Sequence, residues 1–130
     1  MSFIITSNIF LAIPVVISAW KGEWIYFAFA VALIISSSAY HYLKIKRSKS
    51  QTERFFKEAD WIVAGGAYIY MYYFIFTQLD SHIQIPITIV LTSTLLFFWY
   101  GYKWSSYKKM HPWFHVTAFI VSGLIVFLGK

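Results

Sequence analysis

Cysteine is absent from the chain, and acidic residues are scarce: there are 5, against 11 lysines and arginines. Without cysteine the protein has no disulfide and no thiolate metal ligand, so a metal must be held by histidine, carboxylate, hydroxyl or water. Charged residues make up only 12% of the sequence, about half of their share in a typical soluble domain. Neither a Gly-rich phosphate loop nor a nucleophile elbow is present. These shortages argue against a soluble enzyme.

Apolar residues dominate instead, at 59% of the chain, and they fall into long runs. The runs cover residues 3–20, 24–43, 61–79, 83–102 and 113–129. Each is close to the length of about 20 residues that a helix needs to cross a bilayer, and no alternating strand pattern competes. The first run lacks the basic start of a signal peptide, so we expect a retained helix. The sequence predicts one domain over 1–130, an all-α integral membrane protein with a bundle of five transmembrane helices.

Tryptophans and basic residues mark the ends of these predicted helices. All six tryptophans fall there, where indoles favour the lipid–water interface: Trp20, Trp24, Trp61, Trp99, Trp104 and Trp113. Nine of the 11 basic residues lie in two connections: Lys44, Lys46, Arg47, Lys49, Arg54, Lys57, Lys103, Lys108 and Lys109. This distribution indicates membrane orientation rather than a nucleic-acid partner, and predicts a cytoplasmic N-terminus and an outside C-terminus. The connections are solvated segments or are attracted to anionic headgroups.

The ionisable residues at the helix ends gather on one membrane face. His41 lies near the end of the second run, Asp60 opens the third, and His111 and His115 open the fifth. Because successive helices alternate in direction, all four are predicted at the same face, on the cytoplasmic side. Ionisable residues in a membrane are costly and usually functional. His82 falls in the opposite connection, and we assign it no role.

The spacing of the histidines suits a metal site. His111 and His115 are one helical turn apart, about 6 Å between Cβ atoms, and Pro112 fits a first-turn position. Three histidines without cysteine suit zinc with an open fourth position. Ser37 lies one turn before His41, deeper in the membrane. Asp60 is placed to hydrogen-bond a zinc-bound water or to orient a histidine.

Each of these residues also has a simpler interpretation. His41 alone is more often an interfacial or hydrogen-bonded histidine than a ligand. Ser37 alone more often bonds back to a helix carbonyl. Asp60 alone is most simply an N-cap or a first-turn acid. The spacing of His111 and His115 is a weak signal by itself, and only the set as a whole favours a site.

The same residues resemble the motifs of the CREST superfamily. That group includes alkaline ceramidases, progestin and adiponectin receptors, haemolysin III proteins, Per1-like proteins and the lipase that acts on GPI anchors. The motifs here are "SSAYH" with Ser37 and His41, "EADW" with Asp60, and "HPWFH" with His111 and His115. The last looks most like the GPI-anchor lipase branch. The resemblance spans residues 33–129 and implies a zinc ion held by the three histidines, a site lined by the serine and the aspartate, and hydrolysis of an amide or ester bond in a membrane lipid.

The chain departs from this family in its number of helices. Family members usually have seven spans, so five helices would be a reduced version, a homo-oligomer in which another copy closes the cavity, or a degenerate non-enzyme. Our hypothesis is metal-assisted lipid hydrolysis, with Asp60 moving the proton and Ser37 stabilising the oxyanion. The acyl chain would lie beside small residues of the third run, including Ala64 and Ala67, unless these serve only helix packing.

Two other functions stay open. The first is a haem-binding electron carrier, in which His41 and a histidine of the fifth run are axial ligands. That assignment leaves Ser37, Asp60 and the remaining histidine without a role. The second is a non-enzymatic protein, either a receptor-like lipid binder or a structural partner. There the site would bind zinc without turnover, and the loss of Asp60 would leave function intact.

Overall fold

The computed structural model describes residues 3–46, 50–104 and 107–130, without the side chains of 3–4, 104 and 107–108. Among the residues discussed above, Arg47 and Lys49 and the side chains of Trp104 and Lys108 lie outside this description. The described residues form helices and no strand: α1 (Phe3–Thr6), the 3-10 helix η1 (Ser7–Leu11), α2 (Ala12–Lys21), α3 (Trp24–Ile45), α4 (Gln51–Gln78), α5 (Ser81–Trp104) and α6 (Tyr107–Leu128). The predicted all-α class is confirmed.

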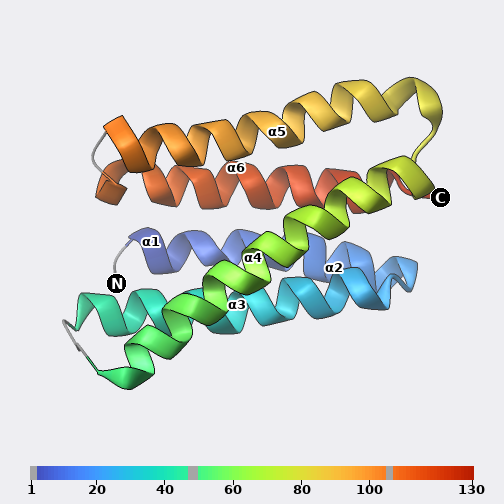
Figure 1. Cartoon of the computed structure of the whole chain (residues 1–130). Coiled ribbons are helices and arrows are strands. Elements are labelled where there is room, and N and C mark those ends of the chain that lie inside the picture. Colours follow the sequence, from blue (N-terminus) through green and yellow to red (C-terminus); the bar gives the residue numbers. More distant parts are fainter. Residues whose placement is uncertain (1–2, 47–49, 105–106) are drawn as a thin grey trace.

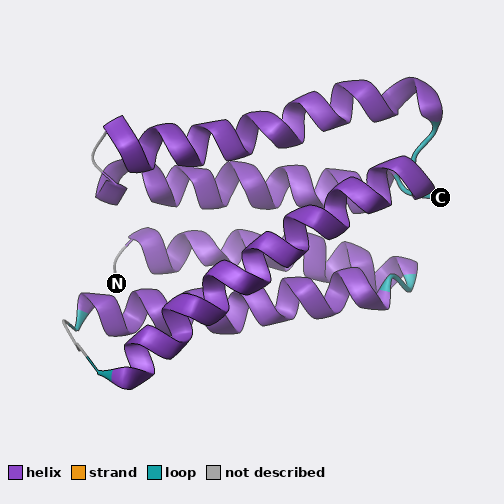
Figure 2. Ribbon diagram, in the orientation of Figure 1, coloured by secondary structure: helices purple, strands orange, loops and turns teal. Residues whose placement is uncertain are grey.

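These elements build antiparallel rods joined by short connections (Figures 1 and 2). The first rod consists of α1, η1 and α2, and it ends in a tight turn at Gly22, whose φ of 73° suits glycine. α3 runs back alongside it, α4 crosses the bundle diagonally, and α5 and α6 pack as a pair (Figure 1). The start of the first rod, the end of α3 and the start of α6 therefore lie at one end of the bundle.

Three helices are long and apolar enough to cross a membrane: Trp24–Ile45, Ser81–Lys103 and Lys109–Leu128. The apolar helix of the first rod, Ser7–Lys21, is shorter. Large apolar side chains also cover the outside of the bundle, where Ile9, Ile62 and Ile69 are each 74% exposed. An outer surface of this kind is suited to lipid, and together with the three long apolar helices it is consistent with the predicted membrane protein.

Two helices, α4 and α6, begin more than one turn earlier than predicted. α4 begins at Gln51 because Ser50 caps it: the Ser50 side chain accepts a hydrogen bond from the Glu53 backbone N–H at 3.3 Å. Asp60 consequently lies in the third turn, so its interpretation as an N-cap or first-turn acid is wrong. α6 begins at Tyr107, and Pro112 lies inside the helix, so the first-turn placement of this proline is also wrong.

The buried core lies toward the end of the bundle opposite to the histidines. One cluster there contains Tyr26 of α3, Phe74 and Ile75 of α4, Leu91 of α5 and Ile125 of α6. A smaller cluster of Leu11, Ala118 and Phe119 joins the first rod to α6 nearer the other end. Both clusters contribute residues to the wall of the cavity described below.

Candidate metal centre

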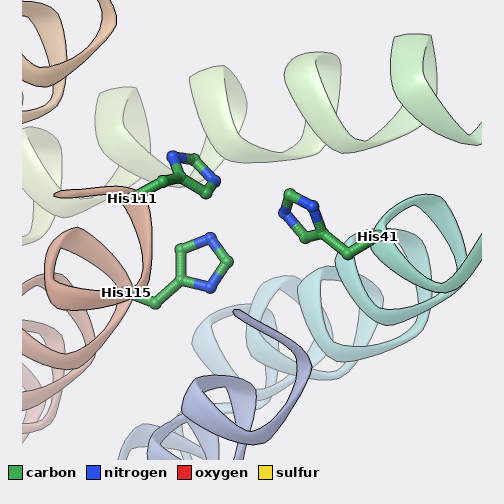
Figure 3. A group of neighbouring side chains, drawn as sticks. All are labelled: His41, His111 and His115. Carbon is green, nitrogen blue, oxygen red and sulfur yellow. The ribbon is translucent and has the colours of Figure 1, made fainter. Parts of the chain in front are cut away.

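Three histidines from two helices meet inside the bundle. His41 comes from the last turns of α3, and His111 and His115 stand one turn apart near the start of α6. Each offers a ring nitrogen, and these ligand atoms lie within 4.8 Å of one another. Figure 3 shows the three side chains pointing toward one another. The predicted meeting of the three histidines, 70 and 74 residues apart in sequence from His41, is confirmed.

The rings are close and shielded from solvent. Their centroids are 5.1 Å apart for His41 and His111, 5.4 Å for His41 and His115, and 4.5 Å for His111 and His115. The exposed fractions are 1%, 7% and 4% for His41, His111 and His115. Burying polar side chains in an apolar bundle is costly unless they gain a partner. Three imidazoles turned toward a common point therefore suit a cation.

His41 shows the need for such a partner most clearly. Its Nε2 atom is buried and has no hydrogen-bond partner within the described ranges. Leaving a buried polar group without a partner costs about 1–3 kcal/mol. A metal ion bound by this nitrogen would remove the cost, so the residues present fit a metal ion.

Two residues that the sequence did not single out support the site. Ser7 and Asn8 belong to η1 and are 0% and 5% exposed. The Ser7 Oγ lies 3.2 Å from His115 Nδ1, a hydrogen bond that would leave the Nε2 of His115 for a metal. Histidine ligands usually have such a partner on their second nitrogen. The only local signal was a polar triplet, residues 6–8, inside an apolar run.

Ser37 is buried and tied to the first rod. The Asn8 side-chain N–H donates to Ser37 Oγ at 3.3 Å and to Ser38 Oγ at 3.1 Å. The bond back to a helix carbonyl is made by the neighbouring Ser36, which donates to the Ala32 carbonyl at 2.8 Å. Ser37 instead lines a cavity together with two of the histidines.

Asp60 lines the same cavity but stands outside the group of three ligands. It precedes the apolar part of α4 and is half-buried. A carboxyl group that lines the cavity can both accept and return a proton during a reaction there.

The cavity has a volume of about 250 Å³ and lies beside the histidines. It reaches from Ser37, Asp60, His111 and His115 into an apolar interior formed by α3, α4, α5 and α6. Ala64, Gly65, Ala67 and Met71 of α4 are among its lining residues, as the hypothesis about the third run requires. His82 is exposed in the first turn of α5, apart from the cluster.

Comparison of the chain with protein-family models, with curated proteins and with solved structures finds no match. The similarity to CREST motifs therefore stays a prediction from the sequence. The function has to be inferred from the site's own residues, which are buried, close together and beside a cavity.

Proposed function

We propose that the protein is a zinc-dependent hydrolase that cleaves an amide or ester bond of a lipid within the membrane. The observation that carries the proposal is the cluster of His41, His111 and His115, whose ligand atoms lie within 4.8 Å of one another beside a cavity. Ser37 and Asp60 line that cavity, as the similarity to CREST enzymes implies. The acyl lipid or ceramide-like substrate would come from the surrounding bilayer.

The protein would span the membrane five times, with the first rod and α4 added to the three long apolar helices. Polar tyrosines lower the hydropathy of α4, but two of them are satisfied inside the bundle. The hydroxyls of Tyr68 and Tyr72 lie 2.7 Å from the hydroxyls of Thr94 and Thr92 on α5. Paired polar groups are compatible with a lipid environment. The basic connections would place the N-terminus and the metal site on the cytoplasmic side.

Zinc is the metal that the donor set favours. Three neutral imidazoles form a common catalytic zinc site with a fourth position open for water or substrate. A bound zinc ion lowers the pKa of the water it coordinates to about 7 and so supplies a nucleophile at neutral pH. Tetrahedral zinc–nitrogen bonds of about 2.0–2.1 Å place the ligand nitrogens about 3.4 Å apart. Nitrogens as far apart as the 4.8 Å limit would therefore have to approach each other when zinc binds.

The remaining site residues have distinct roles in this proposal. The Asp60 carboxylate accepts a proton from the attacking water and returns it to the leaving group. The Ser37 hydroxyl donates to the developing oxyanion of the substrate carbonyl, while Asn8 holds the Ser37 oxygen in place. Ser7 holds the ring of His115 in a fixed orientation. The apolar cavity accommodates the acyl chain and excludes water from the site.

The alternative functions fit these observations less well. A haem would use two of the three histidines as axial ligands and leave the third without a role, although the ligand atoms of all three lie within 4.8 Å of one another. A non-enzymatic lipid binder would use the same cavity. It would give the Asp60 carboxyl, which lines the cavity together with His111 and His115, no chemical role.

Metal analysis of detergent-purified protein tests the proposal. We expect about one zinc ion per chain, as in other three-histidine sites, and its loss in His115→Ala but not in His82→Ala. Ceramides and phospholipids are then screened for hydrolysis with wild type and Asp60→Ala. Protein prepared without chelator that contains no zinc would refute the hydrolase, as would turnover that survives in Asp60→Ala. An iron content with a Soret band would instead support the electron carrier.

A further inference from the structure

The cavity beside the histidines is elongated along the bundle. On α3 its lining begins at Ser37 and continues through Leu33 and Ala30 to Tyr26. These residues follow one face at intervals of three or four positions. At a rise of about 1.5 Å per residue, the 11 steps between the two ends correspond to about 16 Å. The lining positions on α6, from His111 to Ser122, span the same number of steps.

The two ends of this elongated cavity, called the groove from here on, differ in chemistry. Histidines, Asp60 and Ser37 lie at one end, whereas small apolar residues line the middle: Ala30 on α3, Ala67 on α4 and Ala118 on α6. The hydrocarbon core of a bilayer is about 30 Å thick, so one leaflet is about as deep as the groove is long. A molecule with one polar group and one extended acyl chain from a single leaflet matches both the polarity and the length.

The far end of the groove is closed by Tyr26. Its hydroxyl donates to the Ser122 carbonyl at 2.8 Å and lies 2.9 Å from the Ser122 Oγ, which bridges α3 and α6. The ring also packs edge-on against Phe74, with centroids 5.3 Å apart. Beyond it lies closely packed core, where Ile75 and Ile125 are 0% exposed. The Tyr26 side chain is thus held by the hydrogen bonds to Ser122 and by its packing against Phe74. It leaves no space for an acyl chain to continue past it.

We propose that the groove binds a single lipid acyl chain and that Tyr26 is the specificity-determining residue that sets its maximum length. The proposal rests on the proposed function for the position of the reacting carbonyl, which would lie beside the histidines. A chain that starts there must end at the ring of Tyr26. Longer chains would have to displace this ring, together with its hydrogen bonds to Ser122.

The test measures bound chains directly and does not depend on turnover. Lipids that copurify with the intact protein are identified by mass spectrometry, and binding is compared across a homologous series of saturated fatty acids. We expect a sharp upper limit of chain length in wild type. The limit should move to longer chains in Tyr26→Ala and to shorter chains in Ala30→Phe, which fills the middle of the groove. Ala28→Phe adds the same bulk at an exposed position of α3 and should leave the limit unchanged.

Two further variants cover folding failure and the role of the hydroxyl. Tyr26→Phe keeps the ring but loses the bond to Ser122, so the limit should stay that of wild type. Met71→Ala enlarges the same end of the groove if Tyr26→Ala does not fold. A limit that moves neither in Tyr26→Ala nor in Met71→Ala would overturn the role of the far end. Equal effects of Ala30→Phe and Ala28→Phe would overturn the groove itself. If the length limit is retained but no lipid is hydrolysed, only the proposed hydrolase activity is refuted and the acyl-chain groove stands.

Discussion

Replacing His41 with leucine should change the stability of the protein in opposite directions with and without zinc. The side chain is 1% exposed, and its Nε2 is buried without a hydrogen-bond partner in the described chain. In the absence of metal, leucine removes this unpaired polar group and keeps most of the packing volume. The variant should therefore be more stable than wild type by about 1–3 kcal/mol when a chelator is present.

Added zinc should make wild type the more stable of the two proteins. A ligand present at about 1,000 times its dissociation constant stabilises the state that binds it by about 4 kcal/mol. Wild type gains this amount, whereas His41→Leu retains only two of the three ligands and gains little. The difference between the two proteins thus changes to about 1–3 kcal/mol in favour of wild type, which is the gain from zinc less the cost of the unpaired nitrogen.

Thermal unfolding in detergent, with chelator and with added zinc, measures both differences. One kcal/mol corresponds to a shift of roughly 4 °C for a chain of this size, so the reversal is large enough to detect. His82→Leu, at an exposed position away from the cluster, should show no dependence on zinc. If His41→Leu is less stable than wild type by the same amount in both conditions, the histidine serves packing and not a metal.

Three other outcomes follow from the described contacts. Ser7→Ala removes the hydrogen bond to His115 and should weaken zinc binding about 10–100-fold in a chelator competition, whereas Ser18→Ala, buried elsewhere in the first rod, should not. Asp60→Asn should retain zinc but lower lipid hydrolysis about 100-fold or more in a turnover assay, and Asp80→Asn should leave it unchanged. Lys130, 2.6 Å from Asp80, lowers the pKa of that carboxyl. The pair therefore stabilises the folded state above the ordinary carboxyl pKa and loses its effect on acidification, so Asp80→Asn should differ from wild type in unfolding at neutral pH only.

The positions of the helices and the meeting of the histidines were predictable, because both depend on patterns that act over whole segments. Apolar runs locate the rods, and the alternation of rods brings His41 and His115 to one end whatever the packing details. The start of α4 was missed because the polar residues after Gln51 look like a connection. The pairing of Ser50 with Glu53, a capping signal, was nevertheless visible in the sequence.

The contacts made by η1 were not predictable from the sequence. Ser7 meets His115 across 108 positions, and Asn8 meets Ser37 across 29. No local rule connects residues that far apart. Which face of the first rod is buried depends on the 3-10 geometry of Ser7–Leu11, since a 3-10 helix places successive residues at different angles from an α-helix. The polarity of these side chains signalled that they need partners, but only the packing of the rods identifies those partners.

Because the family that the motifs resemble usually has seven spans, one of our expectations was that another copy of the chain closes the cavity. In the structure, every rod contributes to the lining: Leu11 from η1 joins residues of α3, α4, α5 and α6. η1 also provides both hydrogen-bonding side chains that reach the site, Ser7 and Asn8. The first rod therefore serves as a wall of the chamber, and one chain has the residues needed to form both the metal centre and the groove.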